Sequence, residues 1–239
     1  MSENRRDEQT GRSSALELDQ IVFIGRTFEE YVRMFDLRPE ELRGTSILDC
    51  PGGACSFTAR ACELGARAVA ADIAYAFDLE SLRLKGQADI DHTMRQLSKV
   101  SDGFRWEEHG SIDGLKVERL RALRESTDDM ANFPERYVSA VLPGLPFEDE
   151  WFDLTLSAHF LFTYADQLDL DFHVRTLREL LRVTKGELRI FPTADRSGKR
   201  YSQMDELLAS VADSGYSVSE VKTAYEFQSG AHTMLIIRK

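Results

Sequence analysis

Hydrophobic patterning begins after a polar N-terminal stretch. Residues 1–18 are almost entirely polar or charged, which is typical of a disordered tail. Thr27 and Glu30 then form a capping-box pattern at the start of a helix. Apolar residues follow at helical spacing: Phe28, Tyr31, Val32 and Phe35. This helix should end at Arg38, because the residue before Pro39 disfavours the helical conformation.

From residue 45 onward, short apolar runs alternate with amphipathic segments. The runs that predict strands are 46–50, 68–72, 137–141, 152–157, 187–191, 217–221 and 233–238. Helices are expected at 55–64, at the stripe Val174, Leu177, Leu180 and Leu181, and at the stripe Met204, Leu207, Leu208, Val211 and Ala212. A strand, a glycine turn, a helix and a strand make a βαβ unit, which implies a parallel sheet with right-handed crossovers. The pattern predicts one α/β domain over residues 19–239.

Residues 78–136 interrupt this alternation with helix-like stretches around an irregular middle. One interpretation is a helical insertion that buries one face on the sheet. The other is a lid over a substrate, because long insertions in α/β enzymes often line the mouth of the active site. The sequence leaves both interpretations open.

Composition and charge narrow the classes of function. The chain has 239 residues, 42% hydrophobic and 30% charged, which is ordinary for a globular protein. Its net charge of −11 would repel a phosphate backbone, which disfavours nucleic-acid binding unless a local basic patch overrides it. No apolar run approaches the roughly 20 residues of a membrane-spanning helix, and no stretch resembles a secretory signal. We expect a cytoplasmic protein without membrane contact; its oligomeric state stays open.

Cys50, Cys55 and Cys62 are the only cysteines of the chain. An odd number in a cytoplasmic protein argues against a disulfide framework. Their spacing matches no common zinc pattern, and no histidine lies near them in the sequence. We therefore expect packing thiols and no metal site.

The most informative segment joins the first predicted strand to the following helix. Gly52 and Gly53 follow that strand, and glycines there let the backbone approach a ligand closely. The next helix directs its free amides and positive dipole end to the same place. Asp72 ends the second strand, where a carboxylate can accept both hydroxyls of a ribose. Each residue alone could serve only a turn or a cap, but together they favour nucleoside binding.

The same segment narrows the choice of cofactor. It lacks G-x-x-x-x-G-K-[ST], which excludes a P-loop here, and G-x-G-x-x-G, which leaves little to hold a pyrophosphate. Asp49, at the end of the first strand, suits a cofactor with a cationic end better than one with phosphates. S-adenosylmethionine has such an end, with an ammonium group and a sulfonium.

From Ile47 to the C-terminus the chain resembles class I S-adenosylmethionine-dependent methyltransferases, and most of all an uncharacterised bacterial branch. The matching pieces, in the family's order, are ILDCPGGACSF, AVAADIA, LPFEDEWFDLTLSAHFLF, LRELLRVTKGELRIF and GAHTMLIIRK. The resemblance implies a three-layer Rossmann-like methyltransferase fold. Its sheet would have seven strands, mostly parallel, with the last strand antiparallel and 78–136 as a helical insertion.

The resemblance also implies cofactor-binding positions: Asp49, Gly52, Gly53, Asp72, Ile73, Leu142 and Ser157. The first three match the loop around the methionine part of the cofactor, and Asp72 matches the ribose-binding acid. Ile73 would lie against the adenine, Leu142 near its edge, and Ser157 where cofactor and acceptor meet.

Two positions depart from the family pattern. Pro51 replaces the first glycine of the loop, and proline removes an amide donor, so the loop must take a different course. Val141 stands where an acid often follows the third strand, which removes one expected hydrogen bond to the adenine amino group. Neither departure destroys the site, and the sequence leaves open whether they weaken cofactor binding.

Methyl transfer from a sulfonium requires mainly alignment and exclusion of water. A general base is needed only if the acceptor must lose a proton. His159 is the candidate base, because it follows the strand that meets the acceptor; a structural histidine is the alternative.

Four more residues have both a functional and a packing interpretation. Arg26 and Tyr31 could cover the cofactor or hold its carboxylate, although Tyr31 shares the apolar stripe of the first helix. Tyr164 could line the acceptor pocket and Trp106 the lid, or either could simply pack.

The leading hypothesis is a methyltransferase that uses S-adenosylmethionine to methylate a small organic acceptor. Aromatic residues around Phe160 and Phe162 favour an organic acceptor over a nucleic acid. The alternative is a non-catalytic module that binds S-adenosylmethionine or S-adenosylhomocysteine, which Pro51 and Val141 favour. A nicotinamide-dependent oxidoreductase is a third hypothesis, and it lacks the pyrophosphate loop it would need.

Overall fold

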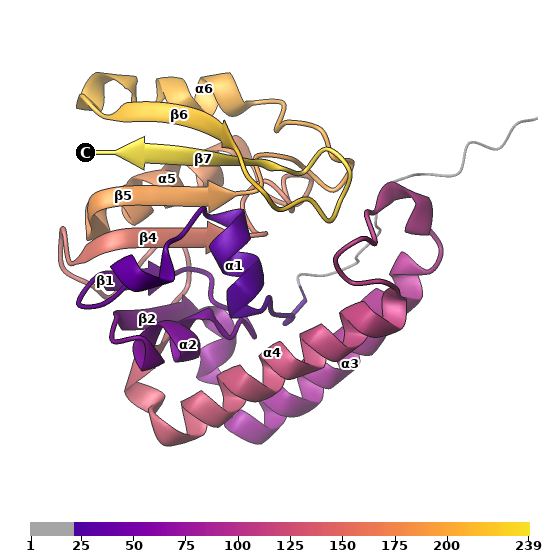
Figure 1. The fold of residues 1–239 in the computed structure, drawn as a ribbon. Coiled ribbons are helices and arrows are strands. Elements are labelled where there is room, and N and C mark those ends of the chain that lie inside the picture. Colours follow the sequence, from indigo (N-terminus) through magenta and orange to yellow (C-terminus); the bar gives the residue numbers. More distant parts are fainter. Residues whose placement is uncertain (1–21) are drawn as a thin grey trace, which may run out of the picture.

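The computed structural model describes residues 22–239; the predicted tail, residues 1–18, lies outside them. In this part of the chain seven strands form one sheet in the order β3-β2-β1-β4-β5-β7-β6 (Figure 1). The strands are β1 Ser46–Asp49, β2 Arg67–Asp72, β3 Tyr137–Ser139, β4 Phe152–Ala158, β5 Thr184–Phe191, β6 Ser217–Lys222 and β7 Thr233–Arg238. Only β7 runs antiparallel to its neighbours, β5 and β6. The predicted Rossmann-like methyltransferase fold is confirmed.

Helices cover both faces of the sheet, which makes three layers (Figure 1). The helices are α1 Phe28–Met34, α2 Phe57–Glu63, α3 Leu79–Leu97, α4 Ile112–Asn132, α5 Leu170–Val183 and α6 Met204–Ala209. Successive residues of a strand point to opposite faces. Ile47 accordingly packs in one core with residues of α1 to α4, and Leu48 in the other with α5 and α6. Neighbouring residues of β1 thus contribute to the two different cores, one on each face of the sheet.

The capping box predicted for the first helix is present. The Thr27 hydroxyl accepts a hydrogen bond from the Glu30 amide, and the Glu30 carboxylate accepts one from the Thr27 amide at 2.8 Å. These two bonds satisfy amides that a helix start leaves without intrahelical partners. Glu30 is nevertheless fully buried, which a capping role alone does not require.

Several element boundaries differ from the sequence prediction. Helix α1 ends at Met34 and not at Arg38, and strand β3 ends at Ser139 and not at residue 141. Helix α6 ends at Ala209 although the apolar stripe continued to Ala212, because the chain tightens into a 3-10 turn before Gly215 at φ +74°. Strand β5 begins at Thr184, directly after α5, and not at Glu187. The Thr184 hydroxyl bonds the Leu180 carbonyl and the Thr155 hydroxyl, so a polar residue starts a buried strand with its hydrogen bonds satisfied.

Helices α3 and α4 lie side by side within residues 78–136 (Figure 1). Gly86 allows their close approach, since a Cβ atom there would lie 2.5 Å from Leu123 Cδ1.

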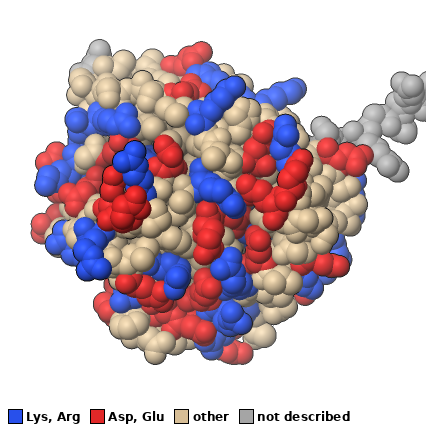
Figure 2. All heavy atoms as spheres, viewed as in Figure 1, with Lys and Arg blue, Asp and Glu red and all other residues tan. Residues whose placement is uncertain are grey.

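No helix within residues 22–239 has the length and apolar content needed to cross a membrane. On the face seen in Figure 2, basic and acidic side chains are interspersed, so no continuous basic patch overrides the negative net charge there.

Candidate functional site

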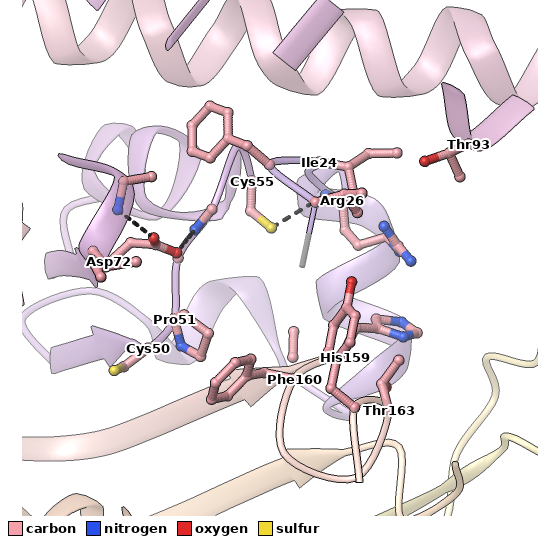
Figure 3. A pocket seen from close by; sticks show the side chains of 18 of the residues that line it. Ile24, Arg26, Cys50, Pro51, Cys55, Asp72, Thr93, His159, Phe160 and Thr163 are labelled. Atoms are coloured by element: carbon pink, nitrogen blue, oxygen red, sulfur yellow. Dashed lines mark hydrogen bonds between the residues drawn. The ribbon is translucent and has the colours of Figure 1, made fainter. Parts of the chain in front are cut away.

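A cavity of about 520 Å³ opens where the strand order reverses, at the carboxyl ends of β1 and β4 (Figure 3). The chain continues from β1 to β2 on one side and from β4 to β5 on the other, and ligands bind in open α/β sheets at such a switch point. Loops after β1, β2, β3 and β4 form the floor, and α3 and α4 contribute Thr93, Met94, Leu97, Leu115 and Arg119. The volume lies within the roughly 300–1,000 Å³ typical of small-molecule sites.

The glycine loop after β1 is held by hydrogen bonds to the end of β2. The Gly52 amide donates to the Ala71 carbonyl at 3.0 Å, and the Gly53 amide donates to Asp72 Oδ2 at 2.9 Å. A Cβ atom at Gly52 would lie 2.6 Å from the Tyr75 hydroxyl, so only glycine fits without rearrangement. Pro51 follows a cis peptide bond. The amides of both glycines donate their hydrogen bonds to other residues of the protein.

Asp72 lies at the centre of this end of the cavity. Its Oδ1 accepts a hydrogen bond from the Ala74 amide at 2.8 Å, so a backbone amide orients each of its oxygens. Burial raises the pKa of Asp72, and these two bonds oppose the rise. Ile73 and Leu142 line the same cavity, and Ile73 is 59% exposed at the surface. The structure thus brings Gly52, Gly53, Asp72, Ile73 and Leu142 together.

Two other predicted residues lie behind the cavity wall. Asp49 and Ser157 are buried at the ends of β1 and β4 and do not line the cavity. The Tyr31 hydroxyl donates to Asp49 Oδ1 at 2.9 Å, whereas Asp49 Oδ2 is buried without a hydrogen-bond partner among the described residues. Burial raises the pKa of Asp49 well above its usual value. Tyr31 therefore supports Asp49 and does not reach the cavity itself.

Asp49→Asn is expected to gain stability relative to the wild type as the pH rises above about pH 4, where this carboxyl ionises in the unfolded chain. The raised pKa keeps the folded protein protonated at this carboxyl, while the unfolded chain ionises it above about pH 4. Wild-type stability is then lost with rising pH, by up to about 1.4 kcal/mol per pH unit, and asparagine removes this loss. Urea unfolding of both proteins across this pH range measures it.

Asp153→Asn serves as the control for this experiment. Hydrogen bonds from Ser46 lower the pKa of Asp153, so that carboxyl is ionised in both states across the same pH range. Its substitution should not change the pH trend. Parallel pH curves for Asp49→Asn and the wild type would contradict a protonated Asp49.

His159 lines the cavity directly after β4. It adopts φ +50°, its ring packs edge-on against Phe191, and its Nε2 is buried without a partner among residues 22–239. Burial lowers the pKa of His159 well below its usual value, and the charge of Arg26 lowers it further. The imidazole is therefore neutral at pH 7 and a weak base.

The remaining aromatic candidates separate into a cavity residue and a packing residue. Tyr164 is buried and lines the cavity. Trp106 does not line it: its indole donates to the Ser101 carbonyl and its ring packs against Phe227.

Cys50, Cys55 and Cys62 are free thiols, and burial raises the pKa of Cys55 to about 12, so they are inert.

Sequence reasoning missed how the segment before α1 closes the site. The Arg26 amide donates to Cys55 Sγ at 3.2 Å, and the Ser56 amide donates to the Arg26 carbonyl at 3.1 Å. Gly25 passes so close to the loop that a Cβ atom there would lie 1.8 Å from the Ala54 oxygen. The only sequence signal was Gly25 itself, which ends an apolar run just before the helix cap.

A buried ion pair beside the cavity was also missed. The two terminal nitrogens of Arg119, in α4, donate to the two carboxylate oxygens of Glu30, in α1, at 2.6 and 2.7 Å. The Tyr225 hydroxyl donates to Glu30 at 2.8 Å. Burial opposes ionisation of Glu30, but the Arg119 guanidinium holds its pKa well below the usual value. Glu30, His109 and Glu118 cluster closely enough for a metal ion, yet Arg119 already occupies both oxygens of Glu30.

Comparisons with known proteins place the chain beside an archaeal relative. No family model matches the sequence. The chain is 34% identical over 225 residues to the uncharacterised protein MJ0045 of Methanocaldococcus jannaschii, covering 94% of this chain and 99% of that protein. Because this relative is archaeal, the bacterial branch suggested by the sequence is not confirmed.

Likeness to solved structures is weaker. The magnesium protoporphyrin IX methyltransferase of Synechocystis PCC 6803 is 11% identical, with 83% of this chain and 71% of that chain covered and a TM-score of 0.43. A SAM-dependent methyltransferase of Aquifex aeolicus is 14% identical, with 87% and 92% covered and a TM-score of 0.38. By sequence, the chain belongs to the family of MJ0045, and by its own sheet order it has the Rossmann-like methyltransferase fold.

Proposed function

We propose that the protein binds S-adenosylmethionine and transfers its methyl group to a small organic acceptor. The observation that carries the proposal is the bond between the Gly53 amide and Asp72 Oδ2, which joins the glycine loop to the acid of the second strand. Both lie at the switch point of the sheet, where nucleoside cofactors bind.

The residues present fit this cofactor. Each oxygen of Asp72 accepts one backbone bond and can accept another, which matches the two hydroxyls of a ribose. Ile73 and Leu142 offer apolar surface beside it for an adenine. Only glycine fits at position 52, where a Cβ atom would lie 2.6 Å from the Tyr75 hydroxyl, and this keeps the loop in place beside Asp72. Asp49 lies behind the loop and does not line the cavity.

The sulfonium supplies an already activated methyl group, so the chain's residues need only bind, orient and exclude water. His159 can accept a hydrogen bond at the acceptor side of the cavity, since its ring is neutral. We propose that α3 and α4, within residues 78–136, act as the lid of this compartment, because they line it opposite the strand ends.

Asp72→Ala is expected to weaken binding of S-adenosylmethionine and S-adenosylhomocysteine by at least about tenfold, or about 1.4 kcal/mol. The substitution removes the ribose acceptors and the anchor of the Gly53 amide. Calorimetric titration of both ligands measures the effect. Asp149→Ala, an exposed carboxylate outside the cavity, should bind as the wild type does. A folded wild-type protein that binds neither ligand would overturn the proposal.

One observation favours a non-catalytic binding module instead. The loop after Pro51 commits the Gly52 and Gly53 amides to the protein, and Val141 offers no acceptor to an adenine. Such a module would hold the ligand without transferring its methyl group. It is distinguished by tight calorimetric binding together with no transfer of labelled methyl to any fraction of a cell extract.

A further inference from the structure

Four cationic side chains line the cavity: Arg26, Lys85, Arg119 and Arg196. Three of them have an acidic partner. Lys85 pairs with Asp89 at 2.7 Å, Arg119 pairs with Glu30, and Arg196 pairs with Asp166. Arg26 alone of the four forms no ion pair within the described part of the chain, although its charge helps to lower the pKa of Glu30.

The Arg26 guanidinium is both unpaired and aimed into the cavity. Its Nε is buried without a hydrogen-bond partner among residues 22–239. Figure 3 shows it across the cavity from Asp72, directed toward His159 and the loop that follows β4. Arg26 as a whole is half-buried, but a buried Nε without a partner is costly, and the fork of a guanidinium matches a carboxylate.

The charge balance of the proposed complex also favours an acceptor with a negative charge. Arg26 and Asp72 are the unpaired charges of opposite sign that line the cavity. S-adenosylmethionine would add two positive groups and one carboxylate, which leaves one net positive charge in a site of low dielectric. An acceptor with one negative charge neutralises the site, whereas a cationic acceptor is repelled.

Apart from Thr93, Thr163, Tyr164 and Gln228, the uncharged side chains on the acceptor side are apolar. Its wall includes Met94, Leu97, Phe104, Leu115, Phe160 and Phe172. Three titratable groups that line the cavity are poor proton acceptors: backbone amides donate to both oxygens of Asp72, Cys55 Sγ accepts the Arg26 amide, and the His159 ring is neutral and weakly basic. An acceptor that needs no deprotonation suits this site.

From these features we propose that the acceptor is a hydrophobic aromatic carboxylate, that Arg26 holds its carboxylate group, and that the product is its methyl ester. The proposal rests on the proposed methyltransferase function. One oxygen of the acceptor forms a bond to the methyl carbon while the carbon–sulfur bond breaks. The electron pair of that bond goes to sulfur, giving neutral S-adenosylhomocysteine thioether and a neutral ester, and no proton is released.

The test uses probes with one aromatic body and three head groups: cinnamate, cinnamyl alcohol and cinnamylamine. Calorimetry on the full chain saturated with S-adenosylhomocysteine should show cinnamate binding at least about tenfold more tightly than the other two. With S-adenosylmethionine, cinnamate should give a base-labile methyl ester. Equal or weaker binding of cinnamate, or methylation of only the alcohol or amine, overturns the inference. Failure of S-adenosylhomocysteine to bind at all overturns the proposed function instead.

Arg26→Gln identifies the group responsible. We expect it to abolish the preference for cinnamate while S-adenosylhomocysteine binds within about twofold of the wild type. Arg26→Lys should restore part of the preference, because the charge returns without the fork. Arg124→Gln, an exposed arginine outside the cavity, is the matched control and should change neither affinity. Weakened S-adenosylhomocysteine binding with an unchanged cinnamate preference would assign Arg26 to the cofactor and overturn the inference.

Discussion

Glu30→Gln is expected to lower the free energy of unfolding by about 3–5 kcal/mol, because it leaves the buried Arg119 guanidinium without its counter-charge. The Arg119 side chain is only 2% exposed, and its two bonds to Glu30 measure 2.6 and 2.7 Å. Glutamine keeps the size and the capping-box geometry at this position, so the loss of stability measures the effect of removing the charge. Urea unfolding at neutral pH measures it.

Glu29→Gln is the matched control for this substitution. Glu29 neighbours Glu30 in the same helix and also pairs with an arginine, Arg121, at 3.1 Å. That pair is exposed, and such pairs contribute about 0–1 kcal/mol. Equal losses from the two substitutions would mean that the buried pair contributes no more than a surface one.

Gly25→Ala is expected to destroy the cofactor-binding side of the cavity and to cost about 1–3 kcal/mol of stability. The added Cβ would lie 1.8 Å from the Ala54 oxygen and 2.6 Å from the Cys55 amide nitrogen, and both are backbone atoms that cannot turn away. The segment before α1 must leave the loop, which breaks its bonds to Cys55 and Ser56. Calorimetric binding of S-adenosylhomocysteine and thermal unfolding measure the two effects.

Gly144→Ala separates this clash from a general effect of replacing glycine. Gly144 is exposed, and a Cβ atom there would come no closer than 3.7 Å to the Val141 oxygen. We expect binding and stability near those of the wild type. Normal ligand binding by Gly25→Ala would mean that the segment before α1 plays no part in forming the site.

Local signals accounted for most of the fold. The capping box at Thr27 and the alternating strands and helices are periodic features of neighbouring residues, so the sequence alone predicts them. The glycine loop and Asp72 follow two adjacent parallel strands, which places them at one edge of the sheet. Where the prediction of α6 was wrong, the apolar stripe continued past the true helix end: Val211 is buried, but Ala212 is exposed at the start of a 3-10 turn.

The sequence by itself determined the positions of the strands along the chain, and the glycine loop and the acid that would bind a nucleoside. The resemblance to the family added the antiparallel last strand. Only the tertiary structure decided which side chains face the cavity: Arg26 does, whereas Asp49, Ser157 and Tyr31 lie behind its wall. It also paired Glu30 with Arg119 and Tyr225, which are 89 and 195 positions away along the chain. Periodicity indicates which face of an element is buried. It does not indicate which residue of a distant element that face contacts, because this depends on how the helical layers pack on the sheet. The same packing leaves Arg26 without an ion pair among the described residues.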